Sequence, residues 1–167
     1  GPQAQRVGDR QALRRQWFFE KRREHRIQLP QMLQRGKCQQ HGKALLWEGH
    51  SIRPELPYLF EGRLPDFNLG TAGGASFPDE LLAPIEALLA AQSQYSWVSN
   101  GRFKGGYITR HYARPDQRIH AIQLELAQSS YMDEAMIAFD AEKALPVQGI
   151  IENMMRAALL SLESGAG

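Results

Sequence analysis

A carboxylate and an imidazole lie two residues apart in the stretch Leu-Leu-Trp-Glu-Gly-His, residues 45–50. Residues 43–47 are apolar after the first residue and too short for a helix, so they predict a strand. Side chains alternate along a strand, so Glu48 and His50 would share one side where the backbone leaves the sheet. Open α/β sheets bind ligands at that edge, and Gly49 would let the chain turn there. A histidine that only caps a loop or bonds to a backbone group is the simpler alternative.

A second carboxylate, Glu125, lies in another predicted strand, residues 120–126. Apolar side chains alternate there with Gln123 and Glu125, so one face is apolar and the other is polar. A glutamate in an otherwise buried strand is costly in free energy unless it has a partner. Glu125 is therefore a candidate for chemistry.

Residues 100–112 combine cations, glycines and aromatic side chains after a strand predicted at residues 95–99. This mixture suits the close approach of the backbone to an anionic ligand. A glycine-rich hairpin with ordinary surface charges is the alternative, and composition does not decide between the two.

The remaining elements must position these groups. Prolines and glycines mark a turn-rich loop over residues 54–74, with a short strand at residues 66–70. Ser76 and Asp79 resemble a capping box that opens a helix, and apolar residues follow at helical spacing. Pro146 suits the first turn of a closing helix. These elements predict an α/β protein.

Length and composition set further bounds. A chain of 167 residues with 43% hydrophobic content predicts one domain with a proper core. Cys38 is the single cysteine, so no internal disulfide can form and a reducing, cytoplasmic location is expected. No apolar run approaches the roughly 20 residues that cross a bilayer. No membrane partner is therefore expected.

The amino-terminal part is strongly charged. Residues 1–2 look like the remnant of a cleaved tag, residues 3–40 predict a charged helical segment, and residues 41–167 carry the rest of the domain. A basic helix that grips phosphates is one interpretation. A solvated helix is favoured, because acidic residues are interspersed and no base-reading motif follows. We therefore expect no nucleic-acid partner.

Several long motifs, in order from about residue 40 to the end, carry a resemblance to one family. The chain resembles the N-formylglutamate amidohydrolase (N-formylglutamate deformylase) family, in its carboxy-terminal portion. The motifs are His50-Ser51-Ile52-Arg53, residues 60–70 (Phe-Glu-Gly-Arg-Leu-Pro-Asp-Phe-Asn-Leu-Gly), residues 100–112, Gln123-Leu124-Glu125-Leu126-Ala127-Gln128 and Tyr131-Met132-Asp133-Glu134.

The resemblance implies a fold and an activity. The implied fold is a three-layer α/β/α domain with a mixed sheet, similar to zinc carboxypeptidases and aspartoacylase-type hydrolases, of which this chain would hold a partial domain. The implied activity is zinc-dependent hydrolysis of N-formyl-L-glutamate, or a related N-acyl amino acid, to glutamate and formate, as in histidine degradation. The implied partner is a small acidic substrate.

The resemblance also implies roles for individual residues. His50 matches a metal-binding histidine of the family, and Glu125 matches the carboxylate that takes a proton from water and passes it to the leaving nitrogen. Arginines suit the substrate carboxylates, because a guanidinium binds a carboxylate through two parallel hydrogen bonds. The substrate-binding candidates are Arg53, Arg63, Asn100, Arg102, Arg110 and Tyr131.

Two departures from the family pattern bear on these expectations. The family typically has an aspartate where this chain has Glu48, a position that orients the imidazole. The family's other metal ligands belong to an amino-terminal half, so this chain is expected to hold half a zinc site and to need that half as a partner. The alternative is a non-catalytic protein that binds acidic amino-acid derivatives, as a sensor or partner subunit.

Overall fold

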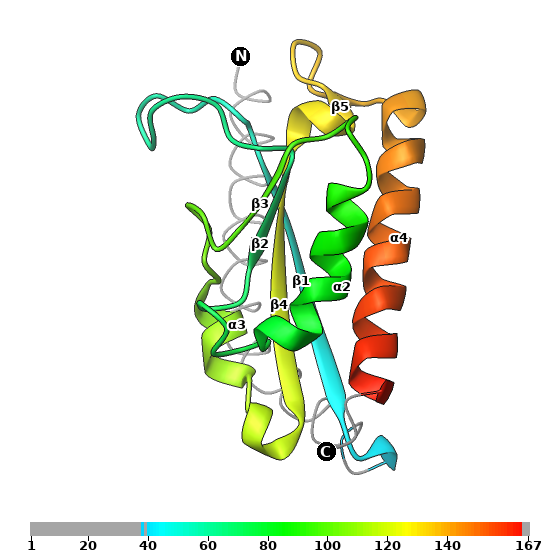
Figure 1. The fold of residues 1–167 in the computed structure, drawn as a ribbon. Coiled ribbons are helices and arrows are strands. Elements are labelled where there is room, and N and C mark those ends of the chain that lie inside the picture. Colours follow the sequence, from blue (N-terminus) through cyan, green and yellow to red (C-terminus); the bar gives the residue numbers. More distant parts are fainter. Residues whose placement is uncertain (1–37, 39, 165–167) are drawn as a thin grey trace, which may run out of the picture.

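The computed structural model describes residue 38 and residues 40–164 of the chain, and a four-stranded sheet is at its centre (Figure 1). The strand order is β1-β4-β2-β3. Strand β4 runs parallel to β1 and antiparallel to β2, while β2 runs parallel to β3, so the sheet is mixed, as predicted. The strands are β1 (Ala44–Ile52), β2 (Phe67–Gly70), β3 (Trp97–Ser99) and β4 (Ile119–Ala127).

Helices lie on both sides of this sheet. Helices α2 (Asp79–Ala90) and α4 (Ala141–Ser164) run side by side over one face, and the short helix α3 (Tyr107–Tyr112) lies on the other side (Figure 1). Short elements complete the fold: η1 (Pro115–Gln117), η2 (Gln128–Ser130), and the hairpin of β5 (Met132–Asp133) and β6 (Ala138–Phe139). The helical segment predicted for residues 3–40 falls almost entirely outside the described residues. No helix in the described ranges is long and apolar enough to cross a bilayer.

The hydrophobic core lies between the sheet and the two long helices. Strand β4 is buried along its whole length, and its residues Ile122, Leu124 and Leu126 pack against α2 and α4, as the predicted alternation requires. Apolar residues of the helices complete the core at the spacing expected for amphipathic helices. These are Leu81, Leu82, Ile85 and Leu89 of α2 and Val147, Met154, Ala158 and Leu162 of α4.

Strand β1 is longer than the sequence predicts. The chain does not turn at Gly49, because β1 continues to Ile52 and stays paired with β4 from Ala44 opposite Ile119 to Ile52 opposite Ala127. Continuous pairing with a nine-residue neighbour keeps the backbone extended through the polar residues, which local sequence rules did not anticipate. Glu48 and His50 therefore lie within the sheet and not in a turn beyond it.

Two predicted helix starts need correction, and the structure decides one open alternative. Helix α2 begins at Asp79 after Pro78 with no side-chain cap, so the capping box at Ser76 is wrong. Helix α4 begins before Pro146, because the Asp140 carboxylate accepts the backbone N–H groups of residues 142 and 143 and starts the helix there. Residues 100–112 form a loop followed by α3 and not a hairpin.

A close backbone approach fixes the loop that leads into α3. A Cβ atom added at Gly70 would lie 2.5 Å from the Gly105 nitrogen and 2.8 Å from the Lys104 carbonyl carbon, so no side chain fits there. The Lys104 carbonyl also accepts the Ala72 N–H at 2.6 Å, and Gly105 has a positive φ of 113°. The end of β2 thus holds this loop by its backbone.

We expect Gly70→Ala to lower the free energy of unfolding by about 1–3 kcal/mol, because the added methyl group must displace the backbone at residues 104–105. Urea unfolding followed by circular dichroism measures the change. Gly49→Ala is the matched control, since a Cβ at Gly49 meets nothing within 4 Å. Equal destabilisation by the two variants would contradict the close approach.

Candidate functional site

The sheet face that carries α3 holds a cluster of polar side chains. The register pairs His50 with Glu125 and Glu125 with Asn68, and it pairs Glu48 with Gln123. Residues paired across neighbouring strands point to the same face, so these side chains form two adjacent rows. We call Glu48, His50, Asn68, Gln123 and Glu125 the polar face. An imidazole and a carboxyl group from neighbouring strands thus lie side by side on this face.

His50 is held by the carboxylate two residues before it. Its Nε2 lies 2.8 Å from Oε1 of Glu48, and the side chain of His50 is 44% exposed while that of Glu48 is 9% exposed. A carboxylate accepts hydrogen bonds, so Nε2 is the nitrogen that holds the proton whenever the ring carries only one. The other ring nitrogen, Nδ1, then presents a lone pair. This arrangement suits a histidine that binds a metal or accepts a proton.

Glu48 is itself fixed from α3. The Thr109 hydroxyl donates to Oε2 of Glu48 at 2.6 Å, and the Thr109 backbone N–H donates to the same oxygen at 3.2 Å. The side chain of Glu48 thus reaches both Thr109 of α3 and His50 of its own strand.

Glu125 is a buried carboxyl group, 7% exposed, in the middle of the polar face. Burial raises its pKa above the ordinary value, because the charged form loses hydration; the charge of Glu48 raises it further, and His50 opposes both effects. A carboxyl group with a raised pKa can take and release a proton nearer neutral pH than an exposed glutamate can.

Asn68 and Gln123 support these two rows, although neither was predicted as a site residue. The Asn68 Nδ2 donates to the main-chain oxygen of Glu125 at 3.1 Å and to that of Pro65 at 2.8 Å. Oε1 of Gln123 accepts the Gly106 N–H at 2.6 Å, which attaches the start of α3 to β4. Position 123 could have been found from the alternation in β4. Asn68 and Thr109 required the strand register and the docking of α3.

The described residues do not contain a complete metal site. Within residues 38 and 40–164, no group of three or more His, Cys, Asp and Glu side chains is placed to hold a metal ion. His120 belongs to the opposite face, where its ring packs edge-on against Phe77 at 6.0 Å between centroids and burial lowers its pKa. The donor set on the polar face therefore supplies one histidine and two carboxylates without closing around an ion.

The predicted substrate-binding residues are scattered. Arg53 is exposed directly after β1, and Arg110 is exposed on α3 beside Thr109. The guanidinium of Arg102 stacks over the Phe60 ring at 4.9 Å. Only the position of Arg110, next to a residue that contacts Glu48, connects one of these arginines to the polar face.

Asn100 has a structural partner for each amide atom. Its Oδ1 accepts the N–H groups of Thr71 and Gly73, and its Nδ2 donates to the Thr71 hydroxyl at 2.8 Å. Its positive φ of 52° places it in a turn. In this structure the amide therefore fixes the loop after β2, and its role in binding a substrate stays a prediction.

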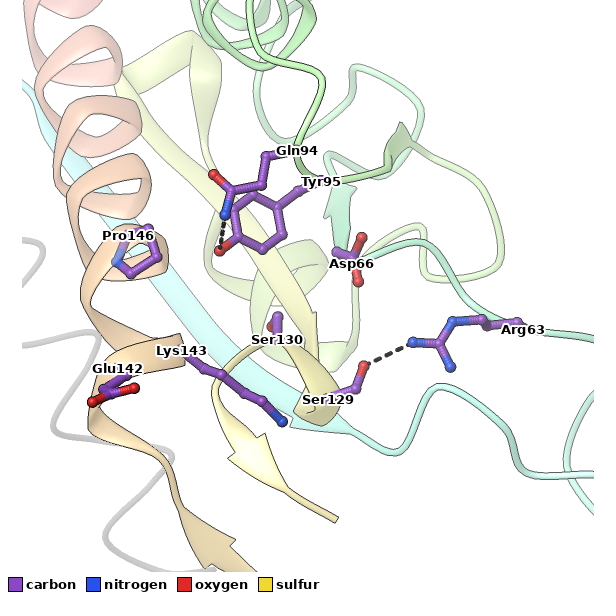
Figure 2. A pocket seen from close by; sticks show the side chains of 9 residues that line it. All are labelled: Arg63, Asp66, Gln94, Tyr95, Ser129, Ser130, Glu142, Lys143 and Pro146. Atoms are coloured by element: carbon purple, nitrogen blue, oxygen red, sulfur yellow. Dashed lines mark hydrogen bonds between the residues drawn. The ribbon is translucent and has the colours of Figure 1, made fainter.

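Tyr131 and Arg63 lie away from the polar face. The Tyr131 hydroxyl bonds to Ser51 at 2.6 Å, and Ser51 points to the opposite side of β1 from its neighbour His50. Figure 2 shows Arg63 at a pocket beside the start of α4, where it bonds to Ser129, and the residues that line this pocket include Lys143 of α4. The structure does not bring these two residues together with His50 and Glu125.

The raised pKa of Glu125 predicts a pH-dependent effect on stability. The unfolded chain releases this proton near the ordinary value of 4.5 and the folded chain releases it at higher pH, so folding loses stability as pH rises from 4.5 through the folded-state pKa. We expect Glu125→Gln to raise the free energy of unfolding at neutral pH, with the gain vanishing below pH 4.5. Thermal unfolding across this range measures it.

Glu61→Gln is the control for this experiment, because Glu61 is an exposed carboxyl group in a loop. It should show no such trend. A gain in Glu125→Gln that grew toward acid pH would contradict the assigned direction of the shift.

Comparison with known proteins places this geometry in a family. The model of the N-formylglutamate amidohydrolase family matches residues 4–132, which begins well before the motifs quoted above and ends before α4. The N-formylglutamate deformylase of Pseudomonas aeruginosa is 56% identical over 119 residues, covering 71% of this chain and 45% of that protein. That of Pseudomonas putida is 50% identical over 122 residues, covering 72% and 46%.

A solved structure supports the fold. The crystal structure of N-formylglutamate amidohydrolase from Ralstonia eutropha JMP134 superposes with a TM-score of 0.62 at 22% identity, covering 87% of this chain and 52% of that one. The chain thus spans about half the length of each of these relatives. With its α/β fold, mixed sheet and family match, the chain belongs to the N-formylglutamate amidohydrolase family.

Proposed function

We propose that this chain contributes the polar face to an active site that hydrolyses N-formyl-L-glutamate to glutamate and formate. The observation that supports this most directly is the pairing of His50 with Glu125 across β1 and β4, which puts an oriented imidazole beside a buried carboxyl group. The names of the Pseudomonas relatives supply the reaction. A related N-acyl amino acid remains a second substrate class.

Glu125 has the properties of the group that moves the proton. In the hydrolysis, a water oxygen adds to the formyl carbon, the bond from that carbon to nitrogen breaks, and the nitrogen gains a proton. Glu125 would accept the water proton and deliver it to the departing nitrogen. Its burial favours this role, because a raised pKa brings the carboxyl group closer to the pH at which both transfers must occur.

Zinc dependence is part of the proposal, but the described residues supply too few ligands for a complete zinc site. A catalytic zinc usually has three protein ligands, and the described residues do not fit such a site by themselves. His50 would be one ligand, since Glu48 engages its Nε2 and leaves Nδ1 for another partner. The other ligands would come from outside the described residues, as would the rest of an α/β/α domain of the carboxypeptidase type.

The substrate carboxylates would bind to arginines. Arg110 is the best placed of the predicted set, because it follows Thr109 on the helix that contacts Glu48. A guanidinium on this side could hold an acidic substrate over the polar face through two parallel hydrogen bonds. Arg63 already bonds to Glu55 and, at the pocket beside α4, to Ser129, which makes it a weaker candidate.

Formate release from N-formyl-L-glutamate tests the proposal. The assay compares this chain with an extended protein, in which the segments that the Pseudomonas relatives have beyond the matched region are joined to this chain. Each is assayed with and without added Zn²⁺. We expect activity in the extended protein, and we expect Glu125→Gln to lower its kcat by about 10²–10⁴ because the proton carrier is lost. Glu61→Gln, in an exposed loop, should retain the rate.

Equal rates for Glu125→Gln and the unaltered protein would remove Glu125 from the mechanism. Calorimetry with glutamate and N-formyl-L-glutamate separates the main alternative. Binding that needs no metal, without turnover in any version, would favour a non-catalytic binder of acidic amino-acid derivatives.

A further inference from the structure

Thr109 is buried at the contact between α3 and the sheet, with 0% of its surface exposed. It gives both of its donors, the hydroxyl at 2.6 Å and the backbone N–H at 3.2 Å, to one oxygen of Glu48. A threonine hydroxyl in a helix can bond to a backbone carbonyl one turn earlier in the same helix. Here it bonds across to β1, at a distance of 61 residues along the chain.

The two oxygens of Glu48 therefore have different partners. Oε2 receives both bonds from Thr109, and Oε1 lies 2.8 Å from Nε2 of His50. Hydrogen bonds to a charged group are stronger than neutral ones, and two donors on one oxygen restrict rotation of the carboxylate. The remaining oxygen is thus directed at the imidazole, which keeps the proton on Nε2 and the lone pair on Nδ1.

The position of Thr109 does not depend on Glu48 alone. The Gly106 N–H donates to Gln123 of β4 just before α3 begins, and the Gly105 backbone lies directly against Gly70 of β2. Two neighbouring strands therefore hold the start of α3, and the helix then presents Thr109 to the third. Because α3 is anchored independently of Glu48, the position of Thr109 is fixed first, and the Glu48 carboxylate orients toward it.

We propose that Thr109 is a positioning residue that acts through Glu48 to fix the tautomer and orientation of His50. The effect of Thr109 on turnover rests on the proposed function, whereas the effect of Thr109 on the His50 ring does not. The hydroxyl is the group to test, because valine would fill the same volume and keep the backbone N–H bond to Oε2 while losing the shorter hydroxyl bond.

The test reads the His50 ring directly. Long-range ¹H–¹⁵N spectra of the unaltered chain, Thr109→Val and Thr109→Ser are recorded at one fixed pH, and His50→Gln identifies the His50 signals. We expect mainly the Nε2-protonated form in the unaltered chain and in Thr109→Ser, and a mixture of tautomers in Thr109→Val. Thr71→Val is the matched control, since it removes an equally buried hydroxyl that bonds to Gly74 and Asn100.

An unchanged tautomer in folded Thr109→Val, or an equal change in Thr71→Val, would overturn the proposal. Should Thr109→Val fail to fold, Thr109→Ala provides the second reading. It removes the same hydroxyl bond to Oε2 of Glu48 without adding a second methyl group at the contact, so the same mixture is expected, and an unchanged ring in the folded variant overturns the proposal equally.

Formate release by the extended protein adds a separate reading. Thr109→Val should lower kcat by about tenfold to a hundredfold, the usual effect of losing a residue that orients a ligand or catalytic group, with rescue in Thr109→Ser. Because the tautomer is measured without substrate, it supports or overturns the role of Thr109 whether or not N-formyl-L-glutamate proves to be the substrate.

Discussion

Continuous parallel pairing of β1 with β4 is the constraint on which the candidate site depends. Over nine residue pairs the two strands stay in step, so every side chain on one has a defined neighbour on the other. A shift of one residue would turn the polar side chains of one strand toward the core and the apolar ones outward. The core contacts of Ile122 and Leu124 with the helices oppose that shift, and in doing so they also fix where Glu125 meets His50.

Strand β4 carries two environments on one backbone. Its apolar side chains enter the core, while Glu125 is buried on the opposite face, where the loss of hydration disfavours its charged form. The neighbouring side chains of His50 and Glu125 differ sharply in exposure, because the His50 side chain is half-exposed and the Glu125 carboxyl group is buried. In the proposed active site, these different surroundings suit a ring that meets a ligand and a carboxyl group that exchanges protons.

The sequence predicted what depends on local pattern. The alternation in residues 120–126 is enough to place Gln123 and Glu125 on one face, and the apolar spacing after Asp79 is enough to define the core side of α2. It did not predict that β1 continues past Gly49, because only pairing with β4 keeps that segment extended. The sequence also did not predict the contact of Thr109 with Glu48. Local pattern gives this threonine no special mark, and its role becomes visible only when α3 is docked on the sheet.

The position of α3 depends on a close approach of backbone segments and on one side-chain bond. A helix of six residues has little stability of its own. Its position is therefore set by Gly70 and Gly105, where the chains approach too closely for any side chain, and by the Gln123 bond to its first turn. A short element anchored in this way has few alternative positions. The same contacts that stabilise α3 thus fix the hydroxyl that orients Glu48, and through Glu48 they fix the imidazole at the end of β1.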